Sequence, residues 1–304
     1  MPAATRTLPQ DAPTGTPGRG RVLVGYDGSA PADRALDLAV REAERRRTGL
    51  EILCGLPWGR PLVPECALDG GSAEALHATA RATLDRAARH VRETAPGTEA
   101  VTTLTAEPVV PALVHAGRTA VLTVLGTRGH GGFSGLLLGS VTLRVAAHTV
   151  SPLLVVRGDA GEQHGTVLVG YSSDNDAAAL RYGFEEARRR GAVLKVVHAW
   201  HFPGAADVNP ARLRWEDVRL LEKSADAVPE FAVSLLRDEY ADVSVTTAAV
   251  CLGAARALTG ESAAADVVVV SAHRRRHGFG LQLGAVTHGL LHHARCPVLL
   301  VPAP

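Results

Sequence analysis

The chain has 304 residues, a length sufficient for about two domains of ordinary size. Hydrophobic residues make up 46% of it and charged residues 21%, which is typical of a globular protein with a buried core. A formal net charge of +1 and an aromatic content of 4% argue against nucleic acid or a membrane surface as a partner.

The amino terminus and the cysteines indicate the cellular compartment in which the protein is expected. Residues 1–20 are rich in Pro, Gly and Thr and lack the apolar core of a secretion signal, so we expect a disordered leader. No apolar run reaches the roughly 18 residues of a transmembrane helix. Four widely spaced cysteines form no CxxC pair and are expected to be reduced thiols: Cys54, Cys66, Cys251 and Cys296. These features predict a cytoplasmic protein.

Apolar runs alternate with segments of helical periodicity throughout the first half. Strands are expected at 22–26, 50–55, 101–106, 120–126 and 152–156, and helices at 32–47, 73–94, 109–118 and 140–149. Continuous apolar runs suit strands that are buried on both faces. Strands separated by helices predict a parallel, doubly wound sheet, in which ligands bind at the carboxyl ends of the strands.

The second half repeats the first. An offset of 145 residues relates three pairs of segments: VLVGY at 22–26 and 167–171, LLLGSVT at 136–142 and LQLGAVT at 281–287, and SPLLVV at 151–156 and CPVLLV at 296–301. Further strands are expected at 193–200, 243–250 and 266–271, and helices at 177–190, 212–240 and 254–264. We therefore expect an α/β protein of two tandem five-stranded parallel doubly wound domains, Rossmann-like or flavodoxin-like.

The domain boundaries follow from this repeat. We expect domain 1 at 21–157, a polar linker at 158–165 and domain 2 at 166–304. The fifth strands, 153–156 and 298–301, are short and strongly apolar, and such edge strands invite pairing. The sequence leaves open whether they pair within the chain, as a pseudo-dimer, or between chains, as a homodimer.

A glycine-rich segment, GTRGHGGFSGLLLGS at 126–140, separates an expected strand from an expected helix. Its pattern is Gly126-x2-Gly129-x9-Gly139-Ser140. The first backbone amides of a helix have no partners within the helix, and with the helix dipole and the Ser140 hydroxyl they could bind an anion. The alternative is a flexible surface loop.

Asp27 follows the first expected strand and has two interpretations. Its carboxylate could accept hydrogen bonds from ribose hydroxyls or an adenine amine. Alternatively, Asp27-Gly28-Ser29 is a turn that caps the following helix. The glycine-rich segment in the same half favours ligand contact.

VLVGYDGS, the spaced glycine pattern and the ending GSVTLRVAAHTVSPLLVVR resemble the universal stress protein family, and the duplication resembles its tandem members. The resemblance covers residues 20 to 303. It implies ATP as the ligand, with or without Mg²⁺. The implied nucleotide-binding residues are Gly25, Asp27, Gly55, Gly126, Thr127, Arg128, Gly129, His130, Gly131, Gly132, Gly139, Ser140 and Val141.

The second half does not keep this pattern. At offset 145 the changes are Asp27 to Ser172, Gly126 to Ser271, Gly129 to Arg274, Gly131 to Arg276, Gly132 to His277 and Ser140 to Ala285. We expect domain 2 to bind ATP much more weakly than domain 1, or not at all. Arg274, Arg275 and Arg276 could attract an anion or form a solvated loop. His288 and His292, at helical spacing, could bind zinc or belong to an ordinary helix face.

The sequence favours a binding module over an enzyme. It has no GxxxxGK[ST] loop, GxSxG elbow or HExxH motif, and no GxGxxG follows either first strand. We expect an ATP-binding stress-response protein that acts as a nucleotide-dependent regulatory module. One alternative is a slow ATPase or phosphotransferase that uses Arg128, His130 and Mg²⁺. A second is a ligand-free dimerising scaffold.

Overall fold

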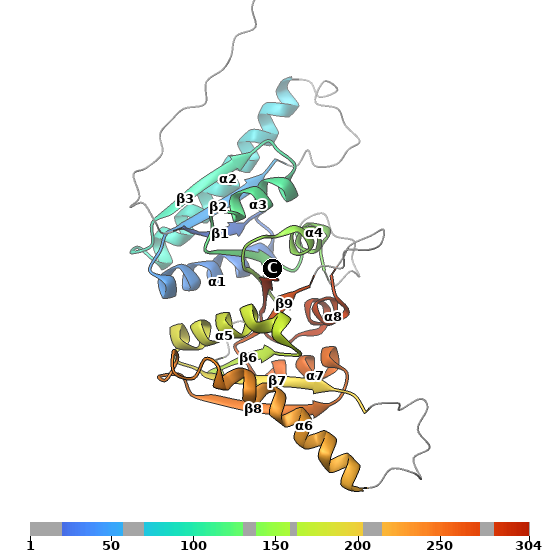
Figure 1. Ribbon diagram of the computed structural model, residues 1–304. Helices are drawn as coiled ribbons and strands as arrows, with labels where there is room; N and C mark the ends of the chain where they lie inside the picture. The colour runs from blue at the N-terminus through green and yellow to red at the C-terminus, as the bar shows by residue number, and fades with distance from the viewer. Residues whose placement is uncertain are drawn as a thin grey trace, which may run out of the picture.

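Ten strands form one continuous sheet in the computed structural model, which describes residues 20–56, 70–129, 138–158, 163–202, 215–273 and 283–303 (Figure 1). The first half contains β1 (Val22–Gly25), α1 (Ala30–Arg46), β2 (Leu50–Gly55), α2 (Gly70–Thr94), β3 (Ala100–Thr105), α3 (Val109–Gly117), β4 (Leu122–Gly126), α4 (Ser140–His148) and β5 (Leu153–Val156). The expected leader, apart from its last residue, lies outside the described residues.

The second half repeats this order. It contains β6 (Thr166–Gly170), α5 (Ala177–Arg190), β7 (Val193–Trp200), α6 (Trp215–Ser234), β8 (Val245–Cys251), α7 (Ala254–Glu261), β9 (Val267–Ala272), α8 (Ala285–His293) and β10 (Val298–Pro302), with short 3-10 turns at η2 (Asp174–Asp176) and η4 (Ser262–Ala264). The helix expected over 212–240 ends at Ser234, and hydrogen-bonded turns follow it, in which Tyr240 N–H donates to Leu236 O. Its expected start at 212 lies outside the described residues. The alternation of strands and helices confirms the predicted fold class.

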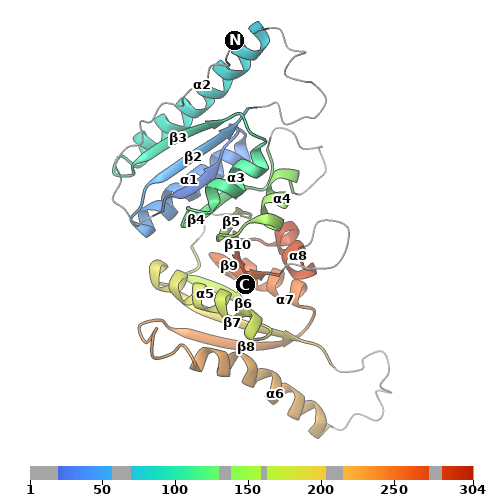
Figure 2. The ribbon, with the colours of Figure 1, turned by 45° about the horizontal axis from the view of Figure 1, so that its top comes forward.

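The strand order is β3-β2-β1-β4-β5-β10-β9-β6-β7-β8, with β3 and β8 at the two ends of the sheet (Figure 2). Within each half all described strand pairs are parallel. One apolar core lies between the sheet and α1, α2, α5 and α6, and a second lies between the sheet and α3, α4, α7 and α8. Helices therefore cover both faces, as the continuous apolar strands required.

The two halves are joined by their fifth strands. β5 pairs with β10 in antiparallel fashion, with Leu154 opposite Leu299. All four residues of β5 are buried. The pairing that the sequence left open is therefore made within the chain, which is an intramolecular pseudo-dimer. A homodimer of chains stays a prediction.

A buried cluster of charges links α1 to α5 across this joint. Arg46 pairs with Glu186 at 2.7 Å, and Arg190 pairs with Glu42 at 2.6 Å. Both glutamates are buried, and each also pairs with the arginine four residues later on its own helix. Burial alone would raise the pKa of the Glu186 carboxyl, but Arg46, Arg190 and Arg189 outweigh it and leave this pKa lowered. The cluster is symmetric, because an offset of 144 residues relates its two halves.

Candidate nucleotide site

The residues predicted to bind a nucleotide come from the carboxyl ends of β1, β2 and β4 and from the start of α4. In the first half, β1 has β2 on one side and β4 on the other, so the strand order reverses there. Ligands of doubly wound sheets bind at such a reversal. The described part of the glycine-rich segment therefore lies at the position where this architecture places a ligand.

Asp27 is exposed and takes part in the turn that begins α1. Its Oδ1 accepts hydrogen bonds from the Ser29 N–H at 3.0 Å and from the Ser29 hydroxyl at 2.6 Å. Ser29 is the N-cap of α1, and its Oγ accepts from Ala32 N–H at 3.3 Å. Its other oxygen, Oδ2, lies against Gly129. The turn interpretation therefore accounts for the hydrogen bonds at Oδ1.

Gly139 brings the start of α4 against the residues that follow β4. It is the N-cap of α4, and its N–H donates to Thr127 O at 2.6 Å. A Cβ atom on Gly139 would lie 3.4 Å from the Arg128 Cα and 3.9 Å from the Gly129 N. The first turn of α4, where Ser140 is exposed, thus lies beside the backbone of residues 127–129.

Gly126 has a packing role that the sequence did not indicate. It is buried at the end of β4, and a Cβ atom there would lie 2.6 Å from the carbonyl oxygen of Pro31. Its own carbonyl accepts a hydrogen bond from the Thr142 hydroxyl at 2.7 Å. The close approach that needs glycine here is the approach of α1 to β4.

Gly25 and Gly55 also face side chains of the protein. A Cβ atom on Gly25 would lie 2.5 Å from Leu125, and one on Gly55 would lie 3.1 Å from Val109. Beside Gly55, burial and the negative charge of Asp27 raise the pKa of the Cys54 thiol to about 11. The negative charge of Asp27 therefore also acts on the thiol near the end of β2.

Two arginines carry positive charge just beyond the ends of the paired strands β4 and β5. Arg128 is exposed, and Arg157 directly follows β5. Burial, together with the charge of Arg128, lowers the pKa of the Arg157 guanidinium. Arg157 also donates a hydrogen bond to the carbonyl of His292 on α8. Val141, in the first turn of α4, packs on the core, whereas His130, Gly131 and Gly132 lie outside the described residues.

The second half has a different set of polar groups at the same place. Ser172, which corresponds to Asp27, donates to Asp176 Oδ2 from its N–H at 2.8 Å and from its hydroxyl at 2.6 Å. His273 Nε2 lies 2.9 Å from Asp176 Oδ1. Sequence reasoning missed Asp176, although offset 145 places it opposite Pro31. Arg274, Arg275, Arg276 and His277 lie outside the described residues.

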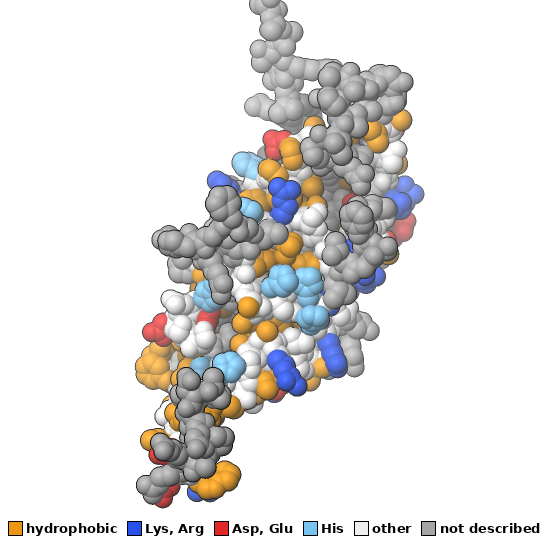
Figure 3. Space-filling view, turned by 90° about the vertical axis from the view of Figure 1, so that its right-hand side faces the viewer, with side chains coloured by type: hydrophobic (Ala, Val, Ile, Leu, Met, Phe, Trp, Pro, Cys, Tyr) orange, Lys and Arg blue, Asp and Glu red, His pale blue; other side chains and the backbone are white. Residues whose placement is uncertain are grey.

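Histidine side chains gather on the face of the molecule that carries α4 and α8 (Figure 3). On α8 the rings of His288 and His292 stack with their centres 4.4 Å apart. Within the residues that the structure describes, no group of three or more His, Cys, Asp or Glu side chains could hold a metal ion. The described geometry thus offers these histidines as a helix face and not as a complete zinc site.

Comparisons with known proteins agree with this architecture. The model of the universal stress protein family matches residues 18–157 and 164–302. A universal stress protein of Mycobacterium tuberculosis is 29% identical over 313 residues, which cover 93% of this chain and 95% of that protein. One of Mycolicibacterium smegmatis is 30% identical over 290 residues, covering 92% and 96%. The chain therefore belongs to the universal stress protein family, and its two matched segments make it a tandem member.

A solved structure with a TM-score above 0.5 shows the same fold. The crystal structure of a universal stress protein from Archaeoglobus fulgidus covers 93% of this chain and 98% of its own, with a TM-score of 0.67 at 17% identity. A universal stress protein crystallised with cAMP is 30% identical and covers 45% of this chain and 97% of its own, with a TM-score of 0.33. The bound cAMP belongs to the structure of that protein.

Among the described helices of this chain, none combines the length and apolarity needed to cross a lipid bilayer.

Proposed function

We propose that the first half binds ATP at the candidate nucleotide site and that the protein acts as a nucleotide-dependent regulatory module in the cytoplasm. The observation that carries the proposal is the contact between Asp27 and Gly129 beside the start of α4. It brings the Asp27 carboxylate and the glycine backbone together at the reversal of the strand order.

Each part of ATP would meet a different group. The Asp27 carboxylate would accept hydrogen bonds from the ribose hydroxyls or the adenine amine. The amides at the start of α4, the Ser140 hydroxyl and the positive charges of Arg128 and Arg157 would attract the phosphates. Gly129 and Gly139 lack the side chains that would separate Asp27, the backbone of residues 127–129 and the start of α4 from one another. Mg²⁺, when bound with ATP, would neutralise part of the phosphate charge.

Equilibrium dialysis of the full chain against radiolabelled ATP tests this proposal. We expect about one equivalent of ATP per chain, lost in Asp27→Ala and weakened in Ser140→Ala. Gly97→Ala serves as a control, because nothing lies within 4 Å of a Cβ atom at Gly97. Failure of the unchanged chain to retain ATP would overturn the proposal, as would full retention by Asp27→Ala.

Turnover separates a regulatory module from a slow ATPase. We expect phosphate release from ATP to stay at the level of a protein-free blank. Sustained release that disappears in Asp27→Ala would instead assign an enzymatic activity to this site, and the regulatory interpretation would then be wrong.

A further inference from the structure

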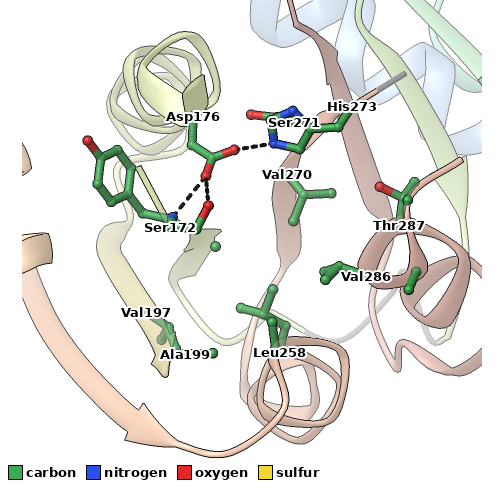
Figure 4. A pocket seen from close by; sticks show the side chains of 15 residues that line it. Ser172, Asp176, Val197, Ala199, Leu258, Val270, Ser271, His273, Val286 and Thr287 are labelled. Carbon is green, nitrogen blue, oxygen red and sulfur yellow. Dashed lines mark hydrogen bonds and ion pairs between the residues drawn. The ribbon is translucent and has the colours of Figure 1, made fainter. Parts of the chain in front are cut away.

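The second half contains a cavity of about 280 Å3 at the carboxyl ends of β6 and β9 (Figure 4). This volume is close to the lower end of the range for small-molecule sites, about 300–1,000 Å3. Its apolar wall comes from β7, β9, α7 and α8: Val197, Ala199, Leu258, Val270 and Val286. Its polar side holds Ser172, Asp176, Ser271 and His273. An apolar body and a small polar group would both find matching surfaces here.

The polar side carries a buried negative charge. Asp176 is 4% exposed and points toward His273 in Figure 4. Burial would raise the pKa of its carboxyl, but hydrogen bonds from Ser172 and contacts with Ser271 and His273 outweigh it, so the pKa is lowered. Asp176 is therefore ionised at neutral pH.

Ser271 places a buried hydroxyl beside the same space. Ser271 is 5% exposed and lines the cavity. The hydroxyl lies close enough to Asp176 to help lower that pKa, yet it makes no hydrogen bond of normal geometry within the described part of the chain. Buried hydroxyls usually have a partner, and leaving one without it costs free energy. A ligand that donates or accepts a hydrogen bond at Ser271 would supply the partner.

The same two positions have different chemistry in the first half. There, Pro31 packs on Gly126, whereas offset 145 places Asp176 and Ser271 at the corresponding positions. An apolar packing contact between the start of the first helix and the end of the fourth strand has become a charged and polar one. The second half has therefore gained ionisable chemistry at its strand ends as well as losing the glycine pattern.

We propose that the cavity of the second half binds a small phosphate-free molecule that has an apolar body and an amine or hydroxyl donor. The donor would lie at Asp176 and Ser271, and the apolar body would lie against Leu258, Val270 and Val286. The start of α8 opposes this preference, but a helix terminus carries only about half an elementary charge. The full negative charge of buried Asp176 outweighs it, so phosphates and carboxylates are disfavoured.

Three molecules of similar shape test the preference: tyramine, tyrosol and 4-hydroxyphenylacetate present an ammonium, a hydroxyl and a carboxylate on the same ring. Methyl NMR of the full chain follows Val197, Leu258, Val270 and Val286 during each titration. We expect saturable shifts with tyramine and tyrosol, and at least tenfold weaker binding of 4-hydroxyphenylacetate. ATP, added to the same sample, should leave these methyl signals in place.

Variants assign the preference to the named groups. Asp176→Asn should remove the advantage of tyramine over 4-hydroxyphenylacetate, whereas Asp174→Asn, an exposed neighbour outside the cavity lining, should preserve it. Ser271→Ala removes a buried hydroxyl that has no partner of normal geometry, so the fold should tolerate it while tyrosol binds more weakly. Equal or tighter binding of the carboxylate, displacement of tyramine by ATP, or no methyl shift with any probe would overturn the proposal. None of these outcomes depends on whether the first half binds ATP.

Discussion

The Oδ2 atom of Asp27 occupies the space into which a side chain on Gly129 would project. Oδ1 of the same carboxylate is held by the N–H and hydroxyl of Ser29, so the group has little freedom to move aside. Gly129 does not have a positive φ, and alanine is therefore compatible with its backbone. The contact makes Gly129 a selective means of disturbing Asp27.

We predict that Gly129→Ala weakens ATP binding by about tenfold, equivalent to about 1.4 kcal/mol, because the added methyl group displaces the Asp27 carboxylate. The midpoint of thermal unfolding should fall slightly, because the displaced carboxylate gives up its two exposed hydrogen bonds with Ser29. Calorimetric titration with ATP measures the effect, with Gly97→Ala as the matched exposed substitution. Unchanged affinity would show that the position of Asp27 does not matter for binding.

Gly126→Ala should act on stability. Its methyl group would press on the backbone carbonyl of Pro31, and backbone atoms cannot move aside as easily as a side-chain end. We expect a loss of about 1–3 kcal/mol in the free energy of unfolding, the usual range for overpacking. Denaturant titration measures it. Gly260→Ala, where a Cβ atom meets open space, should not be destabilising, and an equal loss there would contradict this explanation.

The buried charge cluster predicts a pH-dependent stability. Glu186→Gln leaves Arg46 and Arg190 without one carboxylate partner, and breaking a buried pair costs about 3–5 kcal/mol. The pKa of Glu186 is lowered by folding, so its stabilisation is present above the ordinary value of 4.5 and is lost as the pH falls through the folded-state value. Unfolding midpoints of the two proteins should therefore differ at pH 7 and converge below about pH 4.5.

Glu185→Gln is the control for this experiment. The Glu185 side chain is 38% exposed and pairs with Arg189 at the surface, where such pairs contribute about 0–1 kcal/mol. An equal effect of the two substitutions at pH 7, or a difference for Glu186→Gln that does not shrink as the pH falls below about 4.5, would rule out the buried cluster as the source.

The thiols should differ widely in reactivity. Burial, together with Asp27, raises the pKa of Cys54 to about 11, and burial raises that of Cys296 to about 12, whereas Cys251 is exposed. Because the thiolate is the reactive form, iodoacetamide at pH 8 should modify Cys251 well before Cys54 and Cys296. Peptide mass spectrometry of samples taken over time measures the alkylation of each cysteine. Early labelling of Cys54 in the folded chain would contradict the burial of this strand end.

Much of the fold could be predicted from two signals in the sequence. The 145-residue repeat and the apolar strand segments placed β2 at Leu50–Gly55 and β7 at Val193–Trp200 as expected. The antiparallel joint of β5 and β10 could not be predicted, because apolar edge strands can pair within or between chains. The charge cluster was also missed, since helical positions such as Glu42 and Arg190 become partners only when the two halves meet.

For the candidate sites, too, some features could be predicted from the sequence and others could not. The glycine pattern predicted a nucleotide site, which stays a prediction, and the structure places Gly129 beside Asp27 and Gly139 beside the backbone of Arg128. It could not indicate that Gly126 accommodates Pro31, because glycine is required equally by a ligand and by a neighbouring helix. Asp176 was missed because the comparison of the two halves followed the positions of the first-half motif, and the carboxylate of the second half stands four residues beyond Ser172.

The antiparallel joint of β5 and β10 also has an evolutionary consequence. Two identical subunits that assemble around a twofold axis must share every substitution, so neither site can change without the other. Here one polypeptide contains both partners, and their effective concentration is set by a short tether and not by expression level. One half could therefore retain its glycines while its partner acquired a carboxylate, which gives a covalent heterodimer with two separately adaptable sites.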